Sequence, residues 1–258
     1  MDIRNLPNIV KILLIDRTRA CNIIWANDIF PMAQIKPELV KNIMPRSLKT
    51  LELQKKRTKT KAEVFTPTWI IKKQNDAIDA DYKQDDLETY VKRKWLEITC
   101  GEGPYMTTRY DMITGEFIPI INRVGFVDRK LERINNEIID KNIWQYLVKL
   151  AYKSSYGFEW NGDSLFIARE NLLYTFCDYY YKKWGENPCY NLLEDIANII
   201  SYNVFQMDGL TYTIPLSQET VYQLSLDGIE EEYKMQGIRA KIMNWDTNTM
   251  EFFDKGLK

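Results

Sequence analysis

Short apolar runs that end at turn residues recur along the chain and predict β-strands. Residues 95–98 lead into a glycine-containing turn, and residues 155–159 and 203–206 are two further strand candidates. Residues 109–121 have the pattern of a hairpin with Thr114-Gly115 at its turn. The strands are therefore expected at intervals along the chain.

Between the predicted strands, the spacing of the apolar residues predicts helices. Residues 131–152 are mostly helical in period, with a break expected near Lys141-Asn142, and a helix is also predicted near residues 192–200. From about residue 164 to 184 one helix face is apolar, and Gly185 supplies the stop; this face holds Leu165, Ala168, Leu172, Phe176 and Tyr179. Alternating strands and helices predict an α/β fold with ligand sites at the carboxyl ends of the strands.

Composition narrows the chemistry that this fold can perform. The 258 residues include no histidine, which excludes Ser-His-Asp and Cys-His nucleophilic systems and His-based zinc sites within the chain. The four cysteines are widely spaced, without a Cys-x-x-Cys pair, so we expect neither a disulfide scaffold nor a metal site. No signal-peptide pattern and no bilayer-length apolar run is present, so we expect a cytoplasmic protein without a membrane partner.

The charge is balanced overall but locally uneven. Thirty-five basic residues face 36 acidic ones, so bulk electrostatics do not predict nucleic-acid binding. Residues 49–61, however, contain six basic residues and a single acid, Glu52. This run is either a solvated helix end or linker, or an arm that contacts phosphates.

The turn after residues 95–98 carries the first candidate site. The segment runs Glu97-Ile-Thr-Cys100-Gly101-Glu-Gly103-Pro-Tyr105. Two glycines at this spacing let the backbone approach a ligand closely after a strand. The third glycine of a dinucleotide fingerprint is missing, which argues against NAD.

Three further elements accompany this turn in a fixed order. Phe65-Thr66-Pro67 precedes it, Glu159 ends the next predicted strand, and Asp208 follows the third. Together they resemble the S-adenosylmethionine-binding half of the gamma-class DNA amino-methyltransferases of restriction-modification systems, including restriction endonuclease M subunits. In that family a Phe-Thr-Pro segment precedes an Asp-Pro-x-Cys-Gly-Ser-Gly turn. Here Glu97 and Ile98 replace the Asp and the Pro.

The resemblance implies a Rossmann-like methyltransferase fold and S-adenosyl-L-methionine as cofactor. It assigns the cofactor's methionine end to the first two segments, its ribose to Glu159 and its adenine to Asp208. The cofactor-binding residues would be Phe65, Thr66, Pro67, Glu97, Cys100, Gly101, Gly103, Glu159 and Asp208. Other interpretations remain open: Phe65 as a core aromatic, Glu159 as a solvated strand end, Asp208 as a cap or turn acid and Cys100 as a packing residue.

The family's catalytic Asn/Asp-Pro-Pro-Tyr/Phe tetrapeptide is absent. In motif order its place falls at Asn244 and Trp245, where the amide would accept an amino proton and the indole would stack on a flipped base. A hairpin turn over residues 244–249 explains the same residues without chemistry. Asn187-Pro188-Cys189-Tyr190 is similar in letters but lies outside the motif order, and a turn between helices is favoured there.

The resemblance therefore predicts a DNA methyltransferase, adenine-N6 in type, with double-stranded DNA as a partner. Residues 1–61 would form an N-terminal region with a basic arm, and residues 62–258 the methyltransferase-like domain, without a separate target-recognition domain. Phosphate contacts would come from Lys55, Lys56, Arg57, Lys59 and Lys61. The alternative is a non-catalytic DNA-binding or assembly subunit, completed by a restriction or specificity subunit. An RNA or small-molecule acceptor also stays open, because cofactor motifs do not report the acceptor.

Overall fold

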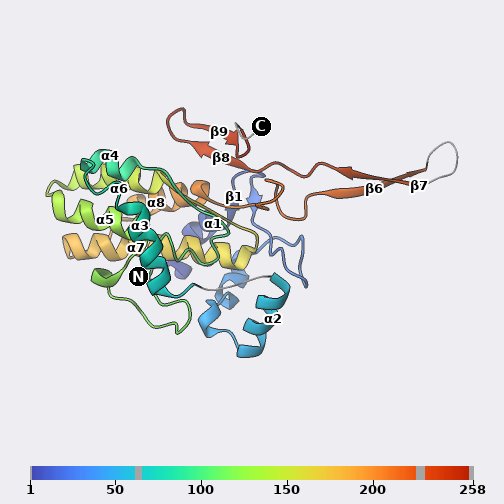
Figure 1. Cartoon of the computed structure of the whole chain (residues 1–258), viewed down its shortest axis with the longest axis horizontal. Helices are drawn as coiled ribbons and strands as arrows, with labels where there is room; N and C mark the ends of the chain where they lie inside the picture. Colours follow the sequence, from blue (N-terminus) through green and yellow to red (C-terminus); the bar gives the residue numbers. More distant parts are fainter. Residues whose placement is uncertain (1, 62–65, 225–229, 256–258) are drawn as a thin grey trace.

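Three short strands form a parallel sheet, which the main helices surround. A computed structural model describes residues 2–61, 66–224 and 230–255 (Figure 1). The strands lie in the order β3 (Trp95–Glu97), β4 (Ser155–Glu159) and β5 (Val204–Gln206), with Glu97 opposite Gly157 and Glu159 opposite Gln206. Because all three run the same way, their carboxyl ends meet at one edge of the sheet. The chain is thus mixed α/β, as predicted.

The helices that connect the strands begin and end at local signals. The helical segment predicted over residues 131–152 divides into α5 (Phe126–Glu137) and α6 (Lys141–Lys153). Asp140 starts α6 by accepting the backbone N–H groups of Asn142 and Ile143, which explains the expected break. Between β4 and β5 lie α7 (Gly162–Trp184), which ends at the left-handed Gly185, and α8 (Tyr190–Asn203).

Helix α7 is buried nearly all round, although its sequence predicted a single apolar face. Every residue from Gly162 to Leu173 is buried. Burial of Arg169 is tolerated because its guanidinium donates to four backbone carbonyls, those of Val204, Leu13, Ile15 and Ser201. Desolvation lowers the pKa of Arg169 to about 9. The polar residues on α7 therefore act as internal links between elements.

The two faces of the sheet are covered differently. One face packs against the helices that connect its strands, α7 above all. The other presents Phe158 and Phe205, which pack with Met207, Ala240 and Phe253 in a second, small cluster. Ala240 and Phe253 flank the C-terminal hairpin of β8 (Lys241–Asn244) and β9 (Thr249–Phe252). The small cluster covers this face only in part, since Leu96 in β3 remains 45% exposed.

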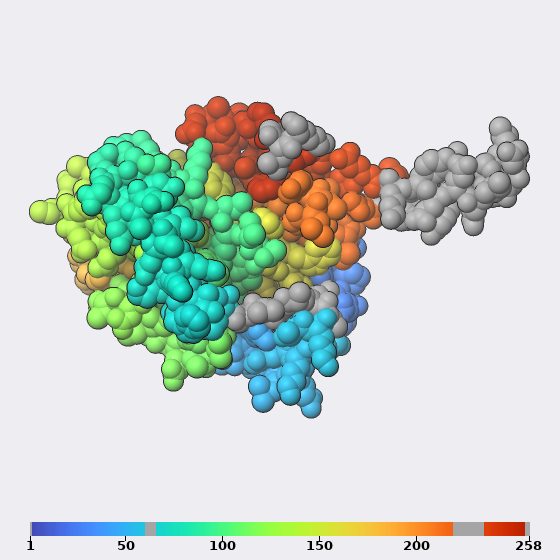
Figure 2. Space-filling model, in the orientation of Figure 1, coloured from blue at the N-terminus to red at the C-terminus, as the bar shows by residue number. Residues whose placement is uncertain are grey.

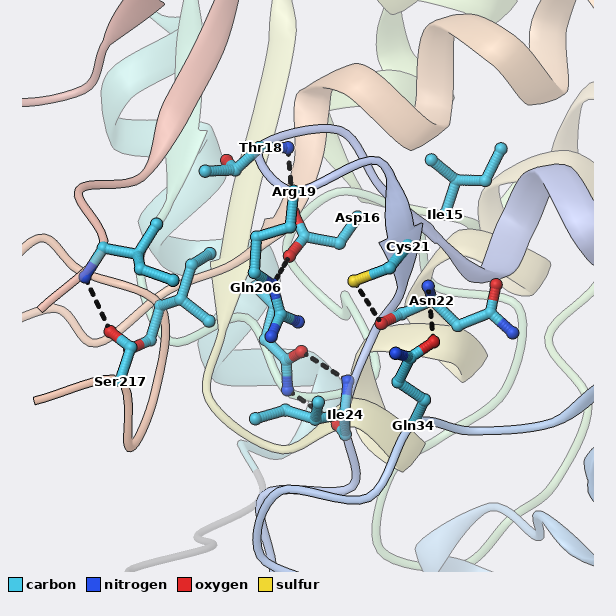
Figure 3. A network of polar contacts seen from close by, with 12 residues as sticks. Ile15, Asp16, Thr18, Arg19, Cys21, Asn22, Ile24, Gln34, Gln206 and Ser217 are labelled. Atoms are coloured by element: carbon cyan, nitrogen blue, oxygen red, sulfur yellow. Dashed lines mark hydrogen bonds and ion pairs between the residues drawn. The ribbon is translucent and has the colours of Figure 1, made fainter. Parts of the chain in front are cut away.

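The first 61 residues share the main core. Helix α1 (Pro7–Leu14) packs on α8 and α7, and Arg4 makes a two-pronged ion pair with Glu170 of α7. The short strands β1 (Ile15–Asp16) and β2 (Cys21–Asn22) follow. Figure 3 shows the Gln206 side chain directed at Ile24, where it accepts from the backbone N–H and donates to the backbone carbonyl. The N-terminal region is thereby fixed to the end of β5.

The remaining elements surround this core. They are η1 (Ile3–Asn5), η2 (Pro37–Asn42), η3 (Arg46–Leu48), α2 (Leu51–Lys61), α3 (Thr68–Asp79), α4 (Leu87–Lys92) and η4 (Ile120–Asn122). A further hairpin, β6 (Glu219–Leu224) with β7 (Glu230–Met235), projects away from the body (Figure 1). Within the described residues, no helix combines the length and the apolar character needed to cross a membrane.

Candidate functional site

The turn that follows β3 is folded back on its own strand. Thr99, Gly101 and Gly103 have positive φ angles of 46°, 54° and 77°, a region that favours glycine. A Cβ atom on Gly103 would lie 3.2 Å from Met106 Cε and 3.4 Å from Ala168 Cβ of α7. Gly103 is therefore required both for its backbone angle and for close packing against α7.

Glu97 holds this turn from inside. Its two carboxylate oxygens accept the backbone N–H groups of Tyr105 at 3.1 Å and Met106 at 2.8 Å. The side chain is buried, and desolvation raises the pKa of Glu97 to about 8 despite these two bonds. Nearby Glu159 adds a smaller charge repulsion in the same direction. Glu97 thus organises the loop, and its carboxyl group is neutral over much of the acidic range.

Glu159 joins the turn to the next strand. Its Oε2 accepts the backbone N–H of Gly101 at 2.9 Å, and its Oε1 accepts the backbone and side-chain N–H groups of Asn161, each at 3.0 Å. Burial raises the pKa of Glu159, while these donors oppose the shift. Two backbone bonds continue the connection, from Cys100 N to Phe158 O and from Met207 N to Glu159 O. All three strand ends are therefore linked.

Glu102, between the two glycines, was not among the predicted site residues. It is 1% exposed, and its carboxylate accepts the backbone N–H of Arg46 and the hydroxyl of Tyr110. Its backbone carbonyl accepts the Asn171 amide of α7. Only its position between the glycines marked it in the sequence. Glu102 connects the turn to the N-terminal region.

A cleft of about 490 Å³ lies at this edge of the sheet, within the usual size range of ligand pockets. Residues from the ends of all three strands line it, together with the C-terminal segment. The lining comprises Leu96, Ile98, Thr99, Phe158, Trp160, Met207, Asp208, Gly209, Leu210, Tyr212 and Phe253. Four aromatic rings and one carboxylate make this an apolar cleft with a single charged group.

The predicted cofactor residues divide into two groups around the cleft. Asp208 lines it, and its oxygens accept Leu210 N–H and Thr211 O–H. The other described residues of the turn and of β4 do not line the cleft; they pack or form hydrogen bonds within the turn next to it. They are Glu97, Cys100, Gly101, Gly103 and Glu159. Burial raises the pKa of the Cys100 thiol well above its ordinary value, so that residue acts in packing.

The Phe-Thr-Pro segment contributes no described residue to the cleft. Phe65 lies outside the described residues, and Thr66 and Pro67 are half-buried just before α3, where Pro67 is the N-cap. Neither Thr66 nor Pro67 lines the cleft. Trp160, in contrast, lines it and was missed by sequence reasoning. Its position directly after Glu159, at the end of a predicted strand, was the signal that could have identified it.

Asn244 and Trp245 lie at the start of the turn between β8 and β9. Asn244 Oδ1 accepts the backbone N–H groups of Asp246 and Thr247, a local bond pattern that shapes turns. Trp245 Nε1 donates to Asn203 at the end of α8, and its ring packs edge-on against Tyr202. Asn244 also lines a second pocket, of about 330 Å³, which shares Leu96 and Phe253 with the cleft.

The basic run forms α2 and is partly used within the fold. Lys49 and Arg57 form ion pairs with Asp163 in the first turn of α7 at 3.1 and 2.9 Å. Burial disfavours the charged Asp163, but the two cations outweigh it and lower its pKa. Lys55, Lys56 and Lys59 are exposed, and the Lys61 side chain lies outside the described residues.

Two predicted functional regions lie far apart. Figure 2 shows α2 along the lower edge of the molecule and the β8–β9 hairpin along the upper edge. Helix α2 and the hairpin that contains Asn244 therefore lie at opposite edges of the molecule in this view. The two-fold ion pair at Asp163 nevertheless anchors the basic helix four residues beyond Glu159, on the side of the strand ends.

The described residues contain no cluster of three or more His, Cys, Asp or Glu side chains able to hold a metal ion. Comparisons with protein-family models, with curated proteins and with solved structures find no match to this chain. The site must therefore be interpreted from its own geometry.

Proposed function

We propose that the chain has a Rossmann-like methyltransferase fold, binds S-adenosyl-L-methionine in the cleft and transfers its methyl group to DNA, at adenine N6. One observation carries the proposal: residues at the ends of three parallel strands line a single cleft, and the glycine turn after β3 is bonded to Glu159 next to it. In open α/β sheets, ligands bind outside the carboxyl ends of the strands. The sequence resemblance supplies the identity of the cofactor and of the acceptor.

The cleft lining suits a nucleoside. Trp160 and Tyr212 offer flat apolar surfaces for a purine ring, and Asp208 offers a carboxylate for an amino or hydroxyl group. Glu159 takes a different role from the one the resemblance implies. Three N–H donors already occupy its carboxylate, so it shapes the loop that would contact the cofactor. In this proposal Glu97 and Glu159 preorganise the site.

The proposed contact with DNA depends on helix α2. Its exposed lysines would contact the phosphates, while Arg57 secures the helix to the body. A DNA contact made in this way should weaken steeply as salt rises, because each phosphate contact releases a condensed counterion.

A second candidate is a non-catalytic DNA-binding or assembly subunit, and one observation favours it. Asn244, the proposed acceptor of the amino proton, already accepts two turn N–H groups, and Trp245 is held by Asn203. A base would have to displace the turn N–H groups before Asn244 could accept its amino proton. In this alternative a partner chain would supply the catalytic tetrapeptide.

Transfer of a tritiated methyl group from S-adenosyl-L-methionine to double-stranded DNA tests the proposal. Incorporation that is lost in Asn244→Ala and kept in Asp246→Asn, in the same turn, supports catalysis by this chain. Incorporation that needs a co-purifying partner supports the subunit alternative. Cofactor binding without incorporation under either condition contradicts the methyltransferase assignment.

A further inference from the structure

A third pocket, of about 320 Å³, lies between helices away from the sheet edge. It shares no lining residue with the cleft at the sheet edge. Its walls come from α3, α4, α5 and α7 and the loop around η4. The lining is Asp79, Lys83, Tyr90, Ile120, Ile121, Arg123, Asp128, Arg129, Glu132, Arg133 and Tyr179.

The acidic residues of this pocket already have donors. Asp79 accepts the Tyr90 hydroxyl at 2.6 Å and pairs with Arg129 at 3.1 Å. Asp128 is fully buried and accepts the backbone N–H groups of Thr108 and Gly125. Glu132 pairs with Lys182 on α7 at 2.6 Å. The hydrogen bonds and ion pairs of these carboxylates thus come from donors other than Arg123, Arg133 and Lys83. The charge of Arg123 acts on Asp128 only as a nearby charge, where it opposes the rise in pKa that burial causes.

Two arginines of the pocket, Arg123 and Arg133, each have one guanidinium nitrogen without a hydrogen-bond acceptor among the described residues. Arg123 donates from Nε to the Ile118 carbonyl and from Nη2 to Asp178, and Arg133 donates to Glu137 and to the Asp85 carbonyl. Nη1 of each is buried without an acceptor among the described residues. Their guanidinium groups lie over the rings of Phe117 and Tyr90, which supply no hydrogen-bond acceptor of ordinary strength.

An unsatisfied buried N–H on a charged group is costly, and such groups commonly mark a missing water or ion. The pocket contains four cationic and three acidic side chains, and Lys83 at its edge is exposed and makes no ion pair with any described residue. Arginine binds planar or tetrahedral oxyanions through paired N–H groups. Ile121, 79% exposed, adds an apolar contact beside these charges.

We propose that this pocket binds the oxyanion group, phosphoryl or carboxylate, of a small ligand through Arg123, Arg133 and Lys83. The rest of the ligand would lie against Ile120 and Ile121. Both arginines already line the pocket. The site is independent of cofactor binding at the sheet edge.

Calorimetric titration of the full chain with inorganic phosphate, and separately with succinate, at low chloride tests this proposal. Arg123→Gln and the double variant Lys83→Gln/Arg133→Gln should each weaken binding at least about tenfold. Lys149→Gln, a surface lysine on α6 paired with Asp195, is the control and should bind as the wild type does. Should Arg123→Gln fail to fold, the double variant, which alters less buried side chains, decides.

Tighter binding of phosphate would assign a phosphoryl ligand, and tighter binding of succinate a carboxylate ligand; both outcomes support the pocket. The absence of saturable binding by either anion would overturn it. Binding that is equally strong in the double variant would overturn it as well, because the anion would then occupy another surface.

Discussion

The backbone N–H of Gly101 donates to Glu159 Oε2 at 2.9 Å, so the glycine turn after β3 is bonded to the carboxylate that ends β4. The two residues are 58 positions apart in the chain. Their bond fixes the turn relative to the sheet before any ligand arrives, and preorganised sites bind with a smaller entropic cost.

Glu159→Ala tests this link. The substitution leaves the N–H groups of Gly101 and Asn161 without their acceptor, and we expect a loss of about 2–3 kcal/mol in the free energy of unfolding. Glu159→Gln keeps one acceptor oxygen and should lose less. Urea titration followed by circular dichroism measures both. A loss below about 0.5 kcal/mol in Glu159→Ala would show that the bond contributes little.

Glu97 predicts an unusual dependence of stability on pH. Its pKa is about 8 in the folded chain, against an ordinary value of 4.5 for a glutamate, so the folded state binds the proton more tightly. The stabilisation is complete below pH 4.5 and is lost as pH rises towards 8, at up to about 1.4 kcal/mol per pH unit. The chain has no histidine, the residue that usually titrates in this range.

Glu97→Gln should flatten this dependence between pH 5 and 8, because the amide cannot titrate while its oxygen can still accept an N–H. Glu159 also has a raised pKa, so the comparison is between the slopes of the wild type and the variant. Urea unfolding at several pH values provides the slopes. Equal slopes would mean that Glu97 is ionised in the folded chain.

A comparison of Gly103→Ala with Gly185→Ala separates the effect of steric crowding from that of backbone strain. Gly185 also has a positive φ, of 68°, but an added Cβ there meets nothing within 4 Å. We expect Gly185→Ala to lower the free energy of unfolding by about 1 kcal/mol and Gly103→Ala by about 2 kcal/mol. The difference arises because an added Cβ at Gly103 also crowds Met106 and Ala168. Thermal and urea unfolding give both values. Equal costs would show that α7 readily moves away from the turn.

Asp163 anchors α2, and Asp163→Asn should release it. The ion pairs with Lys49 and Arg57 are nearly buried, and the substitution removes the negative charge that both cations share. We expect a loss of about 3 kcal/mol and faster trypsin cleavage within α2. Asp195→Asn, in an exposed pair with Lys149, is the matched control and should change stability by less than about 0.5 kcal/mol. Unchanged cleavage would contradict this anchoring role.

The three strands of the parallel sheet could be predicted because each is a short apolar run that ends at a turn. The hairpin predicted over residues 109–121 is reduced to one isolated bridge, between Tyr110 and Phe117. The environment of α7 could not be predicted from periodicity, because Asp163 and Arg169 look like solvent-facing residues in the sequence. Their partners come from distant segments: Arg57 is 106 residues from Asp163. Long-range pairing of this kind leaves no local pattern.

The candidate site was predicted in outline only. The turn and the strand-end acids do meet, but Glu97 and Glu159 face backbone N–H groups, and the cleft wall is formed by aromatic residues such as Trp160. In the sequence, an acidic residue that binds a ligand cannot be distinguished from one that accepts hydrogen bonds from the backbone of a loop. The identity of the cofactor and the DNA target stay predictions from the resemblance.

Calorimetric titration with S-adenosylhomocysteine tests the central claim, cofactor binding in the cleft, most directly. We expect one saturable site in the wild type and a loss of at least about tenfold in affinity in both Trp160→Ala and Asp208→Asn. Trp69→Ala, an exposed tryptophan on α3 outside the cleft, should bind as the wild type does. No binding by the wild type, or equal binding by Trp160→Ala and Asp208→Asn, would contradict the account.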